Sequence, residues 1–476
     1  MPKTTHNPVY HFEGRVQVTE ARGFHQGYLQ FPFDVPAETG ALRLRLRFSP
    51  AKVGGVSNLI TLGLFDPSGF RGNAHRNPPN PEVLITPESA TPGFLPGAIL
   101  PGTWLAQLAL QAVLDSDPPC TYTLDIELLA EPAPAGPMPS PAPVHASSPE
   151  HGAISRQVSQ PGWYRGELHS HTVHSDGSLS TAELLAGARS RGLDFLAVTD
   201  HNTVTALDEI DLAADDGLVI IPGIELTTFY GHALVLGVRE WIDWRTNYNG
   251  WTMDDAARAA HAAGGLFIIA HPQDIPSPVC TGCRWEYEDF DLDLADGVEI
   301  WNGGWRGSND KNPKNLQLWR DLQHDARRLP ATAGSDFHNG LEWWKTAPVT
   351  YIYAQNRSPA ALLEGIRQGR MVLSSGPWLQ FQVSAASESP AVEIGGTLAA
   401  PARRVLVTAE WEKAPPGAEL ALSNRRGSLW RKPVSAAGAM KEWVEANPDD
   451  SLWVELYGAS GDLLAITNPI YIQQPD

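Results

Sequence analysis

Metal-binding side chains recur through the middle of this sequence, most of them close to the point where an apolar, strand-like run ends. They are His169, His171, Asp176, Asp200, His201, Glu225, His232, His271, Asp336 and His338. Imidazole nitrogens and carboxylate oxygens are usual protein ligands of Zn, Mn and Fe. Because a barrel brings its strand ends to one face, the repeated pattern predicts that these side chains converge. Such a site for several metal ions is typical of a hydrolase that uses metal-activated water.

The pair His169 and His171 carries the strongest signal. Alternate residues of a strand point to the same side, so both imidazoles are expected to face one metal site. A lone histidine is about as often a core residue that hydrogen-bonds a backbone carbonyl, but the nearby turn at Asp176 weakens that alternative. Glu225 and Asp336 add carboxylates, which can bridge two cations.

Other polar residues near these runs receive less direct roles. His232 is taken as a ligand although it begins a strand-like run instead of ending one. Asp200 is expected to orient a histidine through the ring nitrogen that does not bind metal. His174 lies in a loop and is expected to support the cluster or to face solvent. Asp336 or His338 is expected to pass a proton to the leaving group.

Basic and aromatic residues near the same runs suggest a substrate pocket. Arg306, Lys345 and Arg370 are candidate clamps for a phosphate or carboxylate, and a surface position is the alternative for each. Tryptophans could wall a pocket for a flat or apolar substrate, or could simply pack the fold. They are Trp285, Trp301, Trp305, Trp343 and Trp344.

Residues 1–130 alternate between apolar and polar side chains with a period of two, as in the stretches 42–48 and 122–128. This period predicts an N-terminal antiparallel β-sandwich. The arginines of the first stretch are interpreted as a solvated sheet face, with a ligand-binding face as the alternative. Residues 131–160 are rich in proline, alanine and serine and predict a linker between domains.

Residues 161–377 alternate between short apolar runs and helical segments, which predicts a complete or distorted (β/α) barrel. The expected strands are 195–198, 218–221, 266–270 and 298–301. The expected helices begin at Ser180, with Glu183 completing a capping box, at Thr252 and at Ser358, and end at Gly192, Gly264 and Gly369. Residues 378–476 return to strand alternation and predict a second, smaller β-sandwich.

The chain is acidic, with 54 Asp and Glu against 35 Lys and Arg and a formal net charge of -19. Phosphate backbones require a basic surface, so a small-molecule substrate is expected rather than nucleic acid. No apolar run of signal-peptide length starts the chain and none reaches about 18 residues, so no membrane partner is expected. The oligomeric state does not follow from the sequence.

Three cysteines, Cys120, Cys280 and Cys283, make an odd count that fits a reducing compartment, and a cytoplasmic location is therefore expected. Cys280 and Cys283 form a single C-x-x-C motif. A closed zinc site would need two further ligands, so two free thiols are the default expectation. Tightening of the loop after His271 and redox activity are the alternatives.

Taken together, these motifs resemble the PHP superfamily, the polymerase and histidinol phosphatase domain, over roughly residues 161 to 377. The motifs are His169-x-His171 with Ser175-Asp176-Gly177, Thr199-Asp200-His201-Asn202, His271, and Ser335-Asp336-x-His338. The stretches 297–302, 369–377 and 467–471 resemble the CehA/McbA branch, which is named for carbaryl hydrolases.

The resemblance implies a distorted (β/α)7 barrel with two to three divalent metal ions, Zn, Mn or Fe. A first metal would be held by His169, His171, Glu225 and Asp336, and a second by Asp176, His201 and His338. Glu225 would bridge to a third metal held by His232 and His271. The implied activity is that of a metal-dependent hydrolase with a metal-bridging hydroxide, in first place a phosphoesterase acting on a small phosphate ester.

Two other functions stay open at this stage. The branch resemblance and the tryptophans favour a carbamate or carboxylic-ester hydrolase of the carbaryl-hydrolase type. A non-catalytic scaffold, in which the flanking domains bind a glycan or a partner, is the alternative of a different class, although a relic site would be expected to have lost ligands. A serine hydrolase is disfavoured because the sequence has no Gly-x-Ser-x-Gly elbow.

Overall fold

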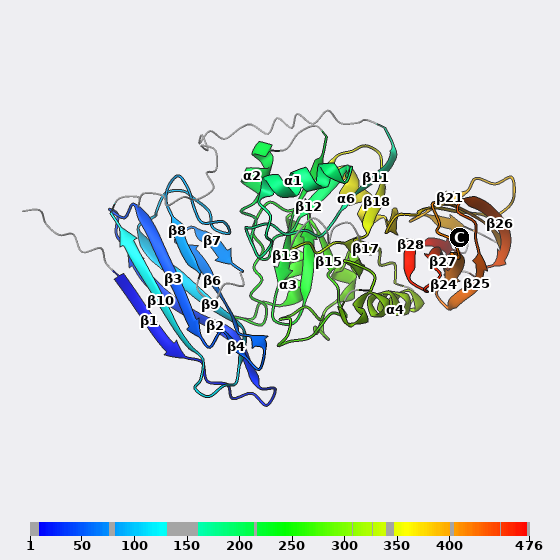
Figure 1. The fold of residues 1–476 in the computed structure, drawn as a ribbon. Helices are drawn as coiled ribbons and strands as arrows, with labels where there is room; N and C mark the ends of the chain where they lie inside the picture. Colours follow the sequence, from blue (N-terminus) through cyan, green and yellow to red (C-terminus); the bar gives the residue numbers. More distant parts are fainter. Residues whose placement is uncertain are drawn as a thin grey trace, which may run out of the picture.

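The computed structural model describes residues 9–75, 81–130, 160–213, 217–306, 308–325, 327–338, 347–399, 404–447 and 449–473. Figure 1 shows three groups of elements in a row: amino-terminal strands in blue and cyan, central strands and helices in green, and carboxy-terminal strands in orange and red. Most of the proposed linker, residues 131–159, lies outside the described residues.

The amino-terminal strands form two four-stranded antiparallel sheets. One has the order β1 (Val9–Arg15), β10 (Thr121–Leu129), β3 (Ala41–Ser49), β8 (Glu82–Ile85). The other has the order β2 (Phe24–Val35), β9 (Gly102–Leu114), β6 (Leu59–Asp66), β7 (Gly69–Ala74). A short hairpin, β4 (Lys52–Val53) and β5 (Val56–Ser57), accompanies them. Side chains of both sheets share one apolar core. These elements are called the amino-terminal sheets below.

The alternation of apolar and polar side chains expected for residues 42–48 is seen on β3. Leu42, Leu44 and Leu46 of β3 are fully buried. The intervening Arg43 and Arg45 both form ion pairs with Glu127 on the neighbouring strand. The arginine row is therefore a charge-paired outer face, as the solvated interpretation predicts.

The central strands form one mixed sheet. From its edge the order is β17 (Ala331–Gly334), β16 (Gly297–Asn302), β15 (Leu266–Ile269), β14 (His232–Leu236), β13 (Val219–Thr227), β12 (Phe195–Val198), β11 (Gly162–Glu167), β18 (Val349–Ala354), β19 (Met371–Ser374). The pairs β11–β12, β12–β13, β15–β16 and β16–β17 are parallel. Strand β14 is antiparallel to both of its neighbours.

Helices α1 (Thr181–Ser190), α2 (Leu207–Ala213), α3 (Met253–Ala262), α4 (Lys311–His324) and α6 (Pro359–Arg367) accompany this sheet, with short 3-10 turns at Leu292–Leu294 and Ser308–Asp310. The expected helix starts are confirmed: Ser180 and Thr252 each form a capping box, and Ser358 caps the helix that begins at Pro359. The glycines expected after these helices, Gly192, Gly264 and Gly369, all have positive φ.

A closed (β/α)7 barrel is not seen among the described residues. The strands form a continuous sheet in which β19 pairs with β28 (Leu463–Thr467), and the strand-type pairing between the segments that follow β11 and β17 is an isolated bridge from Ser170 to Phe337. The sheet therefore crosses the expected boundary at residue 377 into the carboxy-terminal region.

The carboxy-terminal strands complete this sheet and add a second one. The sheet continues from β28 through β27 (Ser451–Tyr457) and β24 (Glu419–Asn424) to β25 (Gly427–Pro433), with β29 (Ile470–Gln473) and β22 (Thr397–Ala399) at its side. A separate four-stranded sheet has the order β21 (Val392–Glu393), β20 (Trp378–Ser384), β23 (Arg404–Glu412), β26 (Gly438–Glu445). Residues of both share one core. In the described part of the chain, no helix has the length and apolarity needed to cross a bilayer.

Candidate metal centre

Nearly all of the residues singled out for metal binding converge at one end of the central sheet. Four overlapping groups of the described residues place their ligand atoms within 4.8 Å of one another. The groups are His169, His171, Glu225 and Asp336; His171, Asp176, His201 and His338; His201, Glu225 and His232; and His169, His271 and Glu299. The first two agree with the two ligand sets implied by the resemblance, except that His171 belongs to both. They are called the first and second positions below.

The Glu225 carboxylate lies at the centre of the cluster. Its Oε2 lies 3.2 Å from Nε2 of His169, 3.2 Å from Nε2 of His171 and 3.0 Å from Nδ1 of His201. Its Oε1 lies 2.9 Å from Nδ1 of His232 and 3.2 Å from Nε2 of His271. The two oxygens therefore face different sets of histidines, which is the geometry of a bridging carboxylate.

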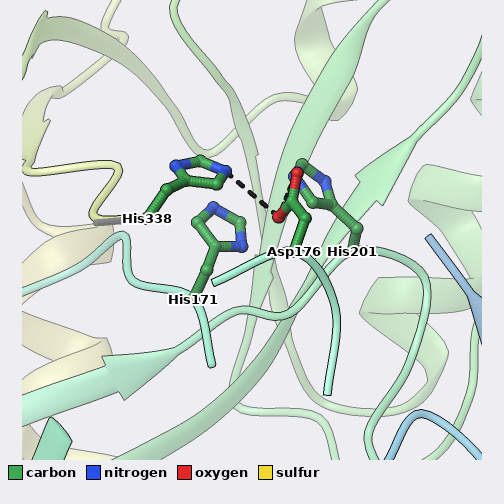
Figure 2. Close-up of side chains that lie close together, drawn as sticks. All are labelled: His171, Asp176, His201 and His338. Carbon is green, nitrogen blue, oxygen red and sulfur yellow. Dashed lines mark ion pairs between the residues drawn. The ribbon is translucent and has the colours of Figure 1, made fainter. Parts of the chain in front are cut away.

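The second position is shown in Figure 2. Oδ1 of Asp176 lies 3.1 Å from Nε2 of His338 and 3.4 Å from Nε2 of His201. The ring of His171 lies beside both histidines, with centroid distances of 4.4 Å to His201 and 4.3 Å to His338. Four chain segments thus contribute to one small space.

Backbone strain accompanies the cluster. Asn202, His271 and Asp336 have φ of 53°, 27° and 51°, in the left-handed region that residues other than glycine rarely adopt. The Asn202 amide holds its segment in place by bonding both the N–H and the carbonyl of Thr227 at 2.8 Å. Such strain concentrates at functional sites, where surrounding contacts fix it.

The donor set fits divalent cations. Among the described residues, Nδ1 of His171, Oδ1 of Asp176 and Oε2 of Glu225 are buried and form no hydrogen bond of good geometry, although histidine nitrogens lie close to both carboxylate oxygens. Buried polar atoms are normally satisfied, and carboxylates buried together are costly unless positive charge lies among them. Imidazoles and carboxylates in this ratio match Zn, Mn or Fe better than Ca or Mg.

The histidines partly supply that positive charge in the metal-free chain. Burial opposes the charged form of His338, but Asp176 and Asp336 raise its pKa to about 10. Burial likewise opposes the charge on His271, whereas Glu225 and Asp336 raise its pKa to about 9. Burial disfavours ionised Asp176, yet His201 and His338 hold its pKa well below the usual range. Cation binding must therefore displace protons from these histidines.

Two buried glutamates that support the cluster were not assigned a role from the sequence. Oε1 of Glu299 lies 3.0 Å from Nδ1 of His169, and Oε2 accepts a hydrogen bond from the backbone N–H of His271 at 3.2 Å. Oε1 of Glu167 accepts from the N–H groups of His169 and Ser335. Glu299 fixes the His169 ring as a carboxylate behind a metal-bound histidine does. A glutamate inside an otherwise apolar strand was the sequence signal that could have identified Glu299.

One supporting role expected from the sequence, that of Asp200, needs correction, and one of the two alternatives for His174 is excluded. Among the described residues, Asp200 makes no hydrogen bond to a histidine. It accepts hydrogen bonds from Thr172 and from the Ser175 hydroxyl, and so orders the loop that carries Asp176. His174 does not face solvent. It is buried, and its Nδ1 lies 2.8 Å from the Thr205 hydroxyl oxygen.

Two of the three candidate anion clamps, Arg306 and Arg370, do not lie at the cluster. Arg306 forms an ion pair with Asp462 in the carboxy-terminal region, and Arg370 lies over the Tyr353 ring. Lys345, like Trp343 and Trp344, lies outside the described residues. Trp301 is fully buried in the core of the central sheet, and Trp285 and Trp305 pack against that core, so the packing interpretation holds for these three.

The expectation of two free thiols is wrong, because Cys280 and Cys283 form a disulfide. The alternative in which this motif tightens the loop after His271 agrees with the contacts. The carbonyl oxygens of Thr281 and Cys283 lie 3.0 Å from Nε2 of His232 and 3.1 Å from Nδ1 of His271. Cys120 is free and buried.

The cluster opens into a cavity of about 370 Å³. Asp176, His201, Glu225, Asp336 and His338 lie along it, and Val56, Leu59, Pro278 and Val279 contribute apolar lining. No arginine or lysine lines it among the described residues. A volume of this size accepts a small molecule. His75, from the amino-terminal sheets, also lines the cavity and was missed from the sequence.

Comparison with known proteins agrees with this geometry. Residues 167–267 match the PHP domain family model. This PHP segment holds six of the nine predicted ligands: His169, His171, Asp176, His201, Glu225 and His232. The match supports the PHP superfamily, while the CehA/McbA branch stays a prediction.

Two curated relatives resemble parts of the chain. A 5'-3' exoribonuclease of Haemophilus influenzae is 41% identical over 63 residues, which are 13% of this chain and 23% of that protein. An uncharacterised protein of Methanocaldococcus jannaschii is 29% identical over 150 residues, which are 29% of this chain and 81% of that protein. The chain thus spans less than a quarter of the exoribonuclease.

Solved structures show weaker likeness. A two-domain protein of Bacteroides vulgatus, containing a predicted PHP-like metal-dependent phosphoesterase, is 17% identical, covers 65% of this chain and 95% of its own, and has a TM-score of 0.38. A putative metal-dependent phosphoesterase of Bifidobacterium adolescentis is 20% identical, covers 37% of this chain and 87% of its own, and has a TM-score of 0.28.

Proposed function

We propose that this protein is a metal-dependent hydrolase whose natural substrate is a small phosphate ester. The observation that carries the proposal is the sharing of ligands: His171 belongs to both the first and the second position, and Glu225 faces histidines with both of its oxygens. A cluster built in this way suits several cations a few ångströms apart, which is the arrangement used by many phosphoryl-transfer enzymes.

The ligand assignment follows the geometry. His169, His171, Glu225 and Asp336 would hold one cation, and Asp176, His201 and His338, with His171, a second. His232 and His271, which both contact Oε1 of Glu225, support a third. Bound cations would activate water at neutral pH and neutralise charge that develops on the substrate.

The protein's own groups have separate tasks in this proposal. Glu299 and the carbonyl oxygens of Thr281 and Cys283 keep His169, His232 and His271 in fixed orientations. His338 is only partly buried and lines the cavity, so the cation that it would hold faces the substrate. The described lining of the cavity contains no arginine or lysine, and the bound cations would provide positive charge for a phosphate.

A carbamate or carboxylic ester is the second candidate substrate, and the apolar part of the lining favours it. Val56 and Leu59 from the amino-terminal sheets and Pro278 and Val279 from the disulfide loop provide a surface for an apolar leaving group. Val279 is 63% exposed, which is unusual for a large apolar side chain and fits the edge of a binding site.

A substrate screen separates the two candidates. Protein purified without chelator, then loaded with Mn or Zn, is assayed with p-nitrophenyl phosphate and 1-naphthyl phosphate and with 1-naphthyl acetate and 1-naphthyl N-methylcarbamate. Phosphate ester turnover that is lost with EDTA and restored by metal is the expected result. Turnover of the acetate or carbamate alone overturns the phosphoesterase proposal. Protein that binds no metal overturns the proposal of a metal-dependent hydrolase.

A further inference from the structure

The amino-terminal sheets form a wall of the catalytic cavity, and His75 is the polar residue that they place against the cluster. His75 directly follows β7, on the sheet with the order β2, β9, β6, β7. Its ring centroid lies 4.4 Å from that of His201, with an angle of 39° between the planes. A residue nearly 100 positions away from the cluster's first motif along the chain thus contacts a ligand of the second position.

The amino-terminal sheets pack closely against the central region near His75. Gly93, with φ of +93°, lies between Asn73 and the loop that carries His174. A Cβ atom there would lie 2.7 Å from the carbonyl oxygen of Asn73 and 2.9 Å from that of His174, so no larger residue fits. The Gly93 carbonyl oxygen accepts from the N–H of Asn73 at 2.9 Å and from the Thr203 hydroxyl at 3.4 Å.

Aromatic contacts fix the same interface over a wider area. Phe70 of β7 stacks on Trp241 with centroids 5.0 Å apart and planes 5° apart. Tyr28 of β2 lies 4.9 Å from Phe229. These rings, which are partly or fully buried between the two regions, help to fix the orientation of β7.

The His75 side chain is left with an unused polar atom. The residue is 8% exposed, and its Nδ1 has no hydrogen-bond partner among the described residues. A buried imidazole nitrogen without a partner is costly, and ligands commonly satisfy such atoms. Because His75 lines the cavity beside His201, its imidazole is placed to bond an oxygen of a bound molecule.

We propose that His75 is a substrate-binding residue, which hydrogen-bonds an oxygen atom of the substrate held at the His201 side of the cluster. The proposal rests on the proposed hydrolase function and names the amino-terminal sheets as part of its active site. In this arrangement the sheets complete the cavity, with His75 contacting the polar head of the substrate and Val56 and Leu59 facing its remainder.

The test uses the full-length, metal-loaded chain and inorganic phosphate as the binding probe. Variants are His75→Ala, His75→Phe, which keeps a ring against His201 without a nitrogen, and His75→Asn, which restores a hydrogen-bonding side chain. His11→Ala is the matched control, because His11 lies on β1 of the other amino-terminal sheet and is half-exposed. Readouts are phosphate affinity by calorimetry, kcat/KM for p-nitrophenyl phosphate, and metal content.

The expected result is a loss of roughly tenfold or more in phosphate affinity and in kcat/KM for both His75→Ala and His75→Phe, since a hydrogen bond to a charged group is worth about that much. Metal content stays at the wild-type value, and His75→Asn recovers part of both losses. His11→Ala behaves as wild type.

Three outcomes overturn the proposal. Wild-type phosphate affinity in His75→Phe would mean that only the ring contact with His201 matters. Loss of metal in His75→Ala would make the residue a support for His201. A wild-type chain that binds no phosphate would remove the ligand that His75 is proposed to contact. Binding of phosphate without hydrolysis of any ester would instead refute the proposed function, while the comparison of the His75 variants would still decide the role of His75.

Discussion

Nδ1 of His271 lies 3.1 Å from the carbonyl oxygen of Cys283, inside a loop that the Cys280–Cys283 disulfide closes. The same loop places the carbonyl oxygen of Thr281 3.0 Å from Nε2 of His232. Both histidines contact Oε1 of Glu225 with their other nitrogen. The disulfide loop therefore sets the ring orientation of two predicted ligands at once, because a carbonyl partner fixes which nitrogen carries the proton.

Removal of this disulfide should weaken metal binding. For the double substitution Cys280→Ser and Cys283→Ser we expect a loss of roughly 2 kcal/mol in the free energy of unfolding, as a small closed loop predicts. We also expect metal affinity to fall by about tenfold to 100-fold. Urea unfolding and competition with a metallochromic chelator measure the two quantities. Dithiothreitol should lower the metal affinity of the wild type in the same way and should not lower that of the double variant further. Metal affinity that changes neither in the double variant nor in the reduced wild type would contradict the role given to the loop.

His201→Ala should remove one cation and abolish turnover while the fold is kept. His201 contacts Asp176 and Glu225, so its loss opens the second position on two sides. We expect metal content per chain to fall and kcat to decrease by at least about 100-fold, with an unchanged circular dichroism spectrum. His261→Ala is the control, because His261 lies on α3 and pairs with Asp296 away from the cluster. Full metal content in His201→Ala would show that the residue is not a ligand.

Glu299→Gln tests the carboxylate that sequence reasoning passed over. The substitution keeps the shape of the side chain but removes the charge that faces Nδ1 of His169. Metal affinity should fall by about tenfold to 100-fold with little change in secondary structure. Glu288→Gln, at an exposed loop position, provides the comparison. Equal affinities of the two variants would rule out a supporting role for Glu299.

Metal-free protein should lose stability as the pH rises above neutrality. The pKa values of His271 and His338 are raised from 6.5 to about 9 and about 10 by nearby carboxylates, against the effect of burial. Their stabilising contribution is therefore complete below pH 6.5, where the unfolded chain also binds these protons, and is lost progressively as the pH rises to about 9 and 10.

Urea unfolding in EDTA between pH 6 and pH 10.5 measures this effect. His338→Gln should flatten the upper part of the decline, since it removes the histidine whose pKa is raised to about 10. Metal-loaded protein should show little of the decline, because bound cations already exclude the protons. A flat profile for the metal-free wild type would show that these carboxylates and histidines do not interact as the structure indicates.

Local features of this protein could be predicted from its sequence. The capping residues Ser180, Thr252 and Ser358 begin helices because their side chains bond N–H groups only three residues away. The apolar and arginine alternation of β3 needs only the period of a strand. The identity of the cluster residues also follows from sequence, because imidazole and carboxylate groups that recur at strand ends are specific in their chemistry.

Relations between distant segments were decided by the tertiary structure alone. His75 carries no motif, and Glu299 lies in a stretch that gave only a family resemblance; both become part of the site because β7 and β16 pack against it. Arg306 has the same charge as an anion clamp but turns to Asp462. The pairing of β19 with β28 joins the carboxy-terminal strands to the central sheet. Spacing along the chain describes neighbours within a few residues, whereas these contacts depend on how whole sheets dock, which is set by the sum of many buried side chains.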